Sequence, residues 1–177
     1  MTYRPASAVK WITLHYTATV VGGPPVSMAT IGKWHKQRGF REAGYHRLIR
    51  LDGTVEYGRE IRADGSFEQG AHSRGENAES VGICYEGGLY PDDVNSGLDT
   101  RTAAQKAAMI EQINEMLALY PNAIVEGHRD MPGATTQCPG FDAGAWWHEV
   151  SRPMDTPPSG LAALISALLS LFTRSKK

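Results

Sequence analysis

Short apolar runs along the chain predict the strands of a buried sheet, because they are rich in Ile, Leu and Val and are bounded by Gly, Asp or Ser. An Asp52-Gly53 pair after the second run has the pattern of a tight hairpin turn, so the residues that follow are expected to return as a neighbouring strand. The predicted strands are residues 11–16, 45–51, 54–59, 80–86 and 123–126.

The sequence predicts three helices. The longest, residues 103–120, would begin at a capping box formed by Thr102 and Gln105 and end before Pro121. Its apolar residues recur at spacings of three and four, as expected for a helix that buries one face. The other two predicted helices are residues 28–38, capped by Ser27, and residues 143–150.

These elements predict an α/β domain with a central mixed β-sheet flanked by helices, because strands alternate with helices and one pair forms a hairpin. The domain would occupy residues 1–152. Residues 153–160 have the Pro-rich composition of a linker. Residues 161–177 place Leu, Ile and Phe at helical spacing before a basic end, which predicts a C-terminal amphipathic helix.

Composition indicates a globular protein without a preference for charged partners. The 177 residues carry a formal net charge of −1, so no global field favours nucleic acid or an anionic membrane. The first residues lack an apolar stretch of signal-peptide length, which predicts synthesis and initial retention in the cytoplasm. Of the two cysteines, too few for a disulfide framework, Cys84 lies in an apolar strand and Cys138 in a polar loop.

The predicted C-terminal helix has two possible roles. As a helix it would be about 20 Å long, shorter than the roughly 30 Å core of a bilayer, so it cannot easily span one. It could lie at a membrane interface with its basic end near anionic headgroups. The alternative is that it packs against the domain or self-associates.

Two histidines and one cysteine are candidate ligands of a catalytic zinc. His15 lies at the end of the first predicted strand, His128 follows the last one, and Cys138 lies in the next loop. Zinc binds Cys sulfur and His nitrogen, and a catalytic site takes three protein ligands. The sequence has no HExxH motif and no paired CxxC, so spacing alone leaves open that these are two unrelated histidines and a spare thiol.

Six short motifs occur in a fixed order within about residues 9–150. They are His15-Tyr16-Thr17-Ala18-Thr19, Gly44-Tyr45-His46, Gly70-Ala71-His72-Ser73-Arg74-Gly75-Glu76-Asn77, Ser80-Val81-Gly82-Ile83, Gly127-His128-Arg129-Asp130 and Cys138-Pro139-Gly140. Together they resemble the type 2 N-acetylmuramoyl-L-alanine amidases, a family that includes amidase-type phage lysozymes and peptidoglycan recognition proteins. The resemblance implies hydrolysis of the amide bond between N-acetylmuramic acid and L-alanine in peptidoglycan.

The resemblance implies one Zn²⁺ ion held by His15, His128 and Cys138, with Tyr45 in the catalytic centre. In many phage members a lysine lies two residues before the ligand cysteine. Here Thr136 occupies that position, as a threonine does in the recognition-protein amidases. Tyr45 and Thr136 are therefore the predicted catalytic residues, which would donate hydrogen bonds to the tetrahedral oxygen or position the water.

Two residues of a glycine-bracketed loop, His72 and Asn77, are predicted to bind the glycan or the peptide, since such loops often line a groove. His35 is expected to pack or to support the site. His46 should point away from Tyr45, because side chains alternate along a strand.

The function expected from these features is that of a phage or prophage endolysin for host lysis. It would be a monomer made in the host cytoplasm that acts on the cell wall after membrane permeabilisation, with lipid contact through residues 161–177. One alternative is a non-catalytic peptidoglycan-binding module, which the intact ligand set argues against. Another is a cytosolic muropeptide-recycling amidase, which usually has Asp where Cys138 stands. Nothing in the sequence speaks for or against RNA polymerase inhibition, which some phage amidases also carry out.

Overall fold

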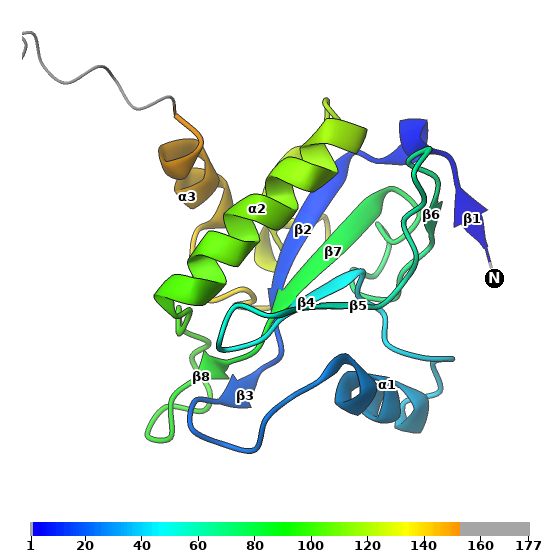
Figure 1. Cartoon of the computed structure of the whole chain (residues 1–177). Coiled ribbons are helices and arrows are strands. Elements are labelled where there is room, and N and C mark those ends of the chain that lie inside the picture. Colours follow the sequence, from blue (N-terminus) through cyan, green and yellow to red (C-terminus); the bar gives the residue numbers. More distant parts are fainter. Residues whose placement is uncertain (1, 153–177) are drawn as a thin grey trace, which may run out of the picture. The chain divides into compact units, whose positions relative to one another are not determined.

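A mixed five-stranded sheet forms the centre of the computed structural model, which describes residues 2–152 (Figure 1). Its strands are β2 (Trp11–Tyr16), β4 (Arg47–Ile49), β5 (Val55–Tyr57), β7 (Ser80–Tyr85) and β9 (Ile124–Gly127). They are arranged in the order β5-β4-β7-β2-β9. The hairpin pair β4 and β5 is antiparallel, and every other neighbouring pair is parallel. The predicted α/β class with a central mixed sheet is confirmed.

The remaining elements are three helices, two short 3₁₀ helices and two small sheets. The helices are α1 (Met28–Gln37), α2 (Ala103–Leu119) and α3 (Ala143–Val150), close to their predicted bounds, and the 3₁₀ helices are η1 (Ala6–Ala8) and η2 (His128–Asp130). The small sheets pair β1 (Tyr3–Arg4) with β6 (Phe67–Glu68), and β3 (Thr19–Val20) with β8 (Gly88–Leu89). The sequence did not predict these strands, because two residues are too few to show an alternating pattern.

Alternation along β2 gives the sheet two chemically different faces. Ile12 and Leu14 are fully buried in the main apolar core, as are Val81 and Ile83 on the neighbouring strand β7. Successive side chains on a strand point to opposite faces, so His15 lies on the face opposite to that of Leu14. The face that carries Ile12 and Leu14 therefore packs in the main core, and the opposite face carries the candidate ligand His15.

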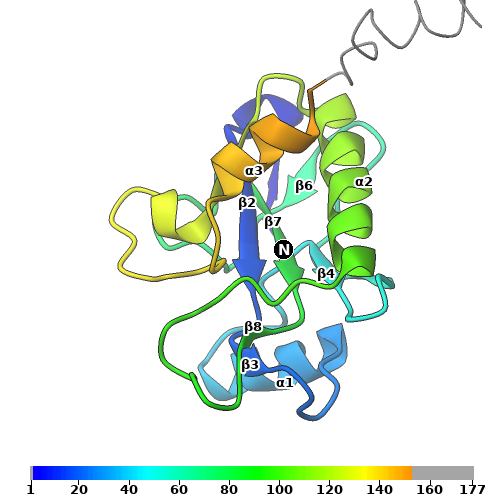
Figure 2. The ribbon, with the colours of Figure 1, turned by 90° about the vertical axis from the view of Figure 1, so that its left-hand side faces the viewer.

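Helix α2 covers the apolar face, and Figure 2 shows it running beside β2 and β7. Met109, Ile113 and Met116 on this helix are buried in the same core as the strands. The predicted capping box is present, with Thr102 and Gln105 each accepting from the other's backbone N–H. The buried Gln105 amide also donates to the carbonyls of Ile49 and Glu86, which fixes the start of the helix against the sheet.

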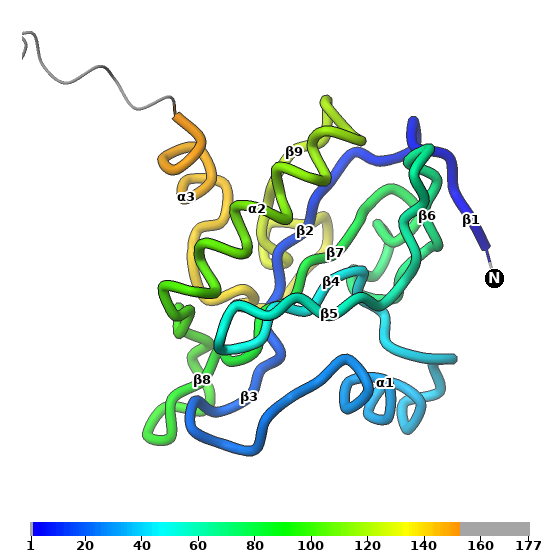
Figure 3. The backbone as a smooth tube through the Cα atoms, viewed as in Figure 1, coloured from blue at the N-terminus to red at the C-terminus, as the bar shows by residue number. Residues whose placement is uncertain are grey.

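Helix α1 lies in the long connection between β2 and β4, whose path Figure 3 traces through β3. Ser27 caps it as predicted, by accepting a hydrogen bond from the Thr30 N–H. Ile31 on this helix is buried in a second apolar cluster together with Leu48 of β4 and Cys84 of β7. Cys84 is thus a buried packing residue, as the sequence indicated.

The strand predicted at residues 45–51 is shorter in the structure, where β4 covers Arg47–Ile49. The consecutive amides of Gly58 and Arg59 donate to the carbonyls of His46 and Tyr45. In a regular antiparallel ladder only every second residue of a strand donates its N–H to the same partner strand. Two consecutive donors therefore mark the point where regular pairing of β4 and β5 ends. Tyr45 is thereby placed just before the strand. The Asp-Gly turn is as predicted, with Gly53 at a φ of 87°.

The predicted linker (residues 153–160) and C-terminal helix (residues 161–177) lie outside the described residues. A boundary between two compact units falls between Trp147 and His148, a few residues before the predicted end of the domain. Within the part of the chain that the structure describes, no helix has the length and apolar character needed to cross a membrane.

Candidate metal centre

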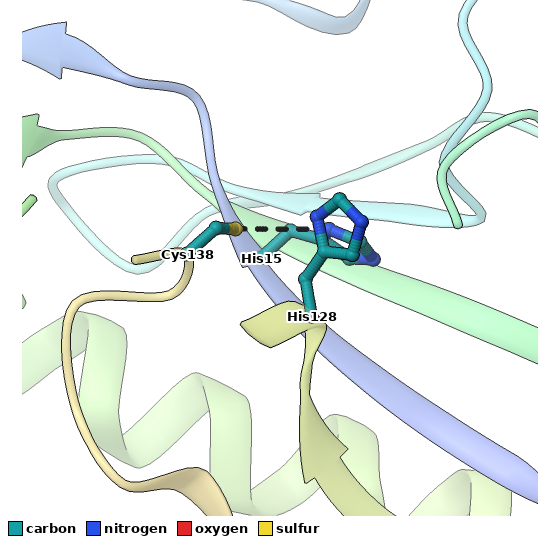
Figure 4. Close-up of side chains that lie close together, drawn as sticks. All are labelled: His15, His128 and Cys138. Carbon is teal, nitrogen blue, oxygen red and sulfur yellow. Dashed lines mark hydrogen bonds between the residues drawn. The ribbon is translucent and has the colours of Figure 1, made fainter. Parts of the chain in front are cut away.

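The three predicted ligands come together at the carboxyl end of two neighbouring strands. Leu14 of β2 faces Gly127 of β9 across a parallel ladder. The residue after each is a histidine, His15 within β2 and His128 at the start of η2. Cys138 approaches from the loop that follows. One side-chain donor atom from each ligand lies within 4.8 Å of the other two, and Figure 4 shows the two rings and the sulfur gathered around one point.

Backbone hydrogen bonds hold the cysteine loop against both strands. The Arg129 N–H donates to the Cys138 carbonyl at 2.7 Å, which ties the loop to the segment that carries His128. The Tyr16 N–H lies 3.3 Å from Cys138 Sγ and donates to it. The same sulfur lies 3.8 Å from Nδ1 of His15. Cys138 is therefore fixed by neighbours of both histidine ligands.

The protonation states of the three side chains suit a soft divalent cation. Burial holds the pKa of His15 well below its usual value and also lowers the pKa of His128, so both rings stay neutral and keep a lone pair for a metal. Burial raises the pKa of the Cys138 thiol to about 12, so a nearby cation is needed to make it a thiolate. Two imidazoles and one thiolate fit zinc and leave a fourth position open.

Tyr45 lies beside the ligands, as the sequence predicted. Its ring centroid is 5.1 Å from that of His15, and the side chain is half-buried. Burial raises the pKa of its phenol well above the usual value, so the hydroxyl stays protonated and can donate a hydrogen bond. His46, the next residue, instead lies with both ring nitrogens on backbone groups, the Gly82 N–H and the Glu68 carbonyl. The two neighbours thus have different partners, and the catalytic role of Tyr45 stays a prediction.

Thr136 lies two residues before Cys138, and its hydroxyl accepts the Cys138 N–H at 3.2 Å. It lines a cavity of about 520 Å³ together with Tyr16, Asn95 and Gln137. Tyr45 and His128 instead line a different cavity, of about 490 Å³. The Thr136 hydroxyl can still donate its own proton, because the bond from the Cys138 N–H uses a lone pair of the hydroxyl oxygen.

His72 and Asn77 both border the cavity of Tyr45 and His128. The ring of His72 is 8% exposed, and its Nδ1 lies 3.0 Å from Nε2 of His15. The side-chain oxygen of Asn77 accepts from the backbone N–H groups of His72 and Ser73. Their predicted contact with substrate stays a prediction. The structure adds a contact of His72 with the candidate ligand His15 and contacts of Asn77 within the loop.

Two arginines on the rim of this cavity, Arg38 and Arg74, were not singled out from the sequence. Arg38 follows the last residue of α1, and Arg74 lies in the His72 loop. Phe40 and His35 complete the same wall, with their ring centroids 5.7 Å apart. Nothing in the local sequence marks the two arginines, because the cavity is formed by two segments that are far apart in the chain, the end of α1 and the His72 loop.

Comparison with known proteins matches residues 5–141 to the family described as N-acetylmuramoyl-L-alanine amidase. The chain belongs to this family. Two relatives are phage endolysins. That of Enterobacteria phage T3 is 34% identical over 147 residues, which are 83% of this chain and 91% of that protein. That of Klebsiella phage KP32 is 38% identical over 124 residues, 70% of this chain and 76% of the relative.

Solved structures of an amidase and of a peptidoglycan recognition protein have the same fold as this amidase-family chain. The endolysin amidase LysCS from Clostridium intestinale is 26% identical, with a TM-score of 0.64, over 86% of this chain and 90% of its own. The peptidoglycan recognition protein PGRP-SA of bumblebee shares the fold at a TM-score of 0.63 and 21% identity, over 89% of this chain and 90% of its own. The resemblance stated from the six motifs is confirmed at the level of family and fold.

The ligand assignment predicts that Cys138→Ser loses most bound zinc, because a buried neutral hydroxyl replaces the anionic sulfur. Metal analysis of the purified protein is expected to fall from about one zinc per chain to a small fraction of it. Cys84→Ala is the matched control, since this second buried cysteine lies outside the ligand set. Full zinc content in Cys138→Ser would contradict the assignment.

Proposed function

We propose that this chain is a zinc-dependent phage endolysin that hydrolyses the amide bond between N-acetylmuramic acid and L-alanine in peptidoglycan. The observation that carries the proposal is the convergence of His15, His128 and Cys138 within 4.8 Å of one another, beside the ring of Tyr45. Membership of the amidase family supports the bond, and the phage endolysins among its relatives support the biological role.

The cavity beside the ligands suits part of a peptidoglycan strand. Its 490 Å³ are bordered by aromatic rings and by the cationic side chains of Arg38 and Arg74. Stem peptides of peptidoglycan carry free carboxylates, for which arginine is a strong hydrogen-bond donor. His72 and Asn77, on the same border, are proposed to contact the glycan or the peptide.

The chain's own residues would do three things in the reaction. The three ligands would hold the metal. A bound metal would act as a Lewis acid that polarises the carbonyl and activates water. Tyr45 keeps its phenol proton, so it can donate a hydrogen bond to the oxygen on which negative charge develops. Thr136 is proposed to assist from the cysteine loop, with the hydroxyl proton that its bond to Cys138 leaves free.

Two other functions are less well supported. A non-catalytic peptidoglycan-binding module would not need three clustered metal donors beside a protonated tyrosine. A muropeptide-recycling amidase would act on small soluble fragments, and the phage relatives argue for the intact wall instead. The first would bind purified walls without releasing product, and the second would prefer soluble fragments to walls.

Product analysis on purified peptidoglycan tests the reaction directly. The expected result is the appearance of new L-alanine amino groups, with no new reducing sugar ends, and loss of activity after treatment with a chelator. Zinc added back should restore it. Release of reducing ends instead would assign a different bond, and full activity of the chelated, metal-free protein would remove zinc from the proposal.

Tyr45→Phe is expected to keep the fold and the zinc but to lose activity on walls by a hundredfold or more, on the order reported for the loss of one oxyanion donor. Tyr57→Phe is a matched control, because this tyrosine is 67% exposed on β5. Equal turnover by Tyr45→Phe and the unmodified protein, with equal zinc content, would exclude the catalytic role.

We also propose that the protein is made in the host cytoplasm, reaches the wall after membrane permeabilisation, and contacts lipid through residues 161–177. The apolar spacing and basic end of this segment support lipid contact. Full-length protein should bind vesicles of anionic lipid and make them leak, whereas a version that ends at Ser159 should do neither while keeping wall hydrolysis. Identical vesicle binding by both versions would remove the lipid role.

A further inference from the structure

We propose that His72 is a positioning residue for the metal site, which accepts a hydrogen bond from His15 and so holds that ligand ring in its metal-binding tautomer. The inference rests on the proposed zinc function, because it concerns how one ligand is prepared. If His72 orients His15, the loop from Gly70 to Asn77 supports the metal site in addition to any contact with substrate.

The two nitrogens of His15 face different partners. Nδ1 is 3.8 Å from Cys138 Sγ and therefore lies on the ligand side, as the dashed line in Figure 4 shows. Nε2 is 3.0 Å from Nδ1 of His72, and the two rings are nearly perpendicular at 83°. The His72 nitrogen thus lies near the edge of the His15 ring, where an N–H points.

This arrangement determines where the protons lie. A ring nitrogen that binds a metal carries no proton, so a neutral His15 bound through Nδ1 has its proton on Nε2. That Nε2–H then donates to Nδ1 of His72, which must be unprotonated to accept it. Neutral His72 in turn carries its own proton on Nε2.

Within residues 2–152 the contact with His15 is the one well-formed hydrogen bond of the His72 ring. Its other nitrogen, Nε2, is buried and lacks a well-aligned partner among these residues, although the ring also has a weaker contact with the backbone of Ser80. The Nδ1 contact with the proposed ligand His15 is therefore the main polar interaction of this ring.

Two glycines leave the space that the His72 ring occupies. A Cβ atom on Gly82 would lie 2.8 Å from the ring carbon Cγ, and one on Gly70 would lie 2.6 Å from Cδ2. Both distances are too short for a real side chain. Gly82 is part of β7 and is paired with Thr13 of β2, so one wall of this slot is the central sheet itself.

Asn77 fixes the backbone that carries the ring. Its side-chain oxygen accepts the His72 N–H at 2.8 Å and the Ser73 N–H at 2.9 Å. The loop is therefore closed on itself at the residue that contacts His15. A sheet wall on one side and a closed loop on the other leave the His72 ring little freedom to turn away.

Partners of this kind fix the orientation of a metal-bound histidine and raise its basicity, and their loss typically weakens metal binding 10- to 100-fold. His72→Leu removes the acceptor while keeping a side chain of similar bulk. His72→Asn keeps an oxygen attached to Cγ, as Nδ1 is, so it can accept from His15. His46→Gln is the control, since this buried ring lies 5.6 Å from His72 but, among the described residues, bonds to backbone groups only.

Zinc dissociation constants, measured by competition with a chromophoric chelator on the folded full-length proteins, test the proposal. We expect roughly 10- to 100-fold weaker binding for His72→Leu, and near-normal binding for His72→Asn and His46→Gln. Unchanged zinc affinity in His72→Leu would overturn the inference, as would an equal loss in the Leu and Asn variants of His72. If the unmodified protein bound no zinc, the proposed function itself would fail.

A second measurement needs no variant that must fold. In zinc-loaded protein labelled with ¹⁵N-histidine, long-range ¹H–¹⁵N correlation spectra report which ring nitrogen carries the proton. We expect protons on Nε2 of both His15 and His72, and slow exchange of the His15 Nε2–H. A proton on Nδ1 of His72 would overturn the inference even if the zinc site were intact.

Discussion

The parallel pairing of β2 with β7 and β9 is the constraint on which the site depends. Parallel strands bring their carboxyl ends to one edge of the sheet, and the Leu14–Gly127 register places His15 and His128 at the same level of that edge. A shift of one residue in β2 would turn His15 towards α2 and Leu14 towards the site. The apolar contacts of α2 with the sheet thus select the register that brings the candidate metal ligands together.

Much of this arrangement could be predicted from the sequence, for reasons that are local. The strands around Ile12 and Val81 are short, mostly apolar runs, and α2 carries its own start signal in Thr102 and Gln105. Such signals lie within a few neighbouring residues and do not depend on the rest of the fold. The family resemblance then added the ligand set, which spacing alone had left open.

What the sequence could not give was contact between distant segments. The bond between His15 and His72 joins a strand end to a loop 57 residues further along, and no periodic pattern reports such a pairing. Arg38 reaches the cavity rim only through the turn after α1. The end of regular pairing at Tyr45 likewise depends on how Gly58 and Arg59 bond across the hairpin. Each of these depends on tertiary geometry.

The same burial that protects the site also links metal binding to protons. With the pKa of Cys138 raised to about 12, the thiol is protonated at neutral pH when no cation is near. A zinc ion that takes this sulfur as a thiolate must therefore displace a proton, and binding must strengthen as pH rises. The histidines add little to this effect, because burial already lowers the pKa of His15 and His128 and keeps them neutral. The thiol is thus the ligand whose ionisation opposes metal binding, and its hydrogen bond from the Tyr16 N–H partly offsets that cost, since it favours the thiolate.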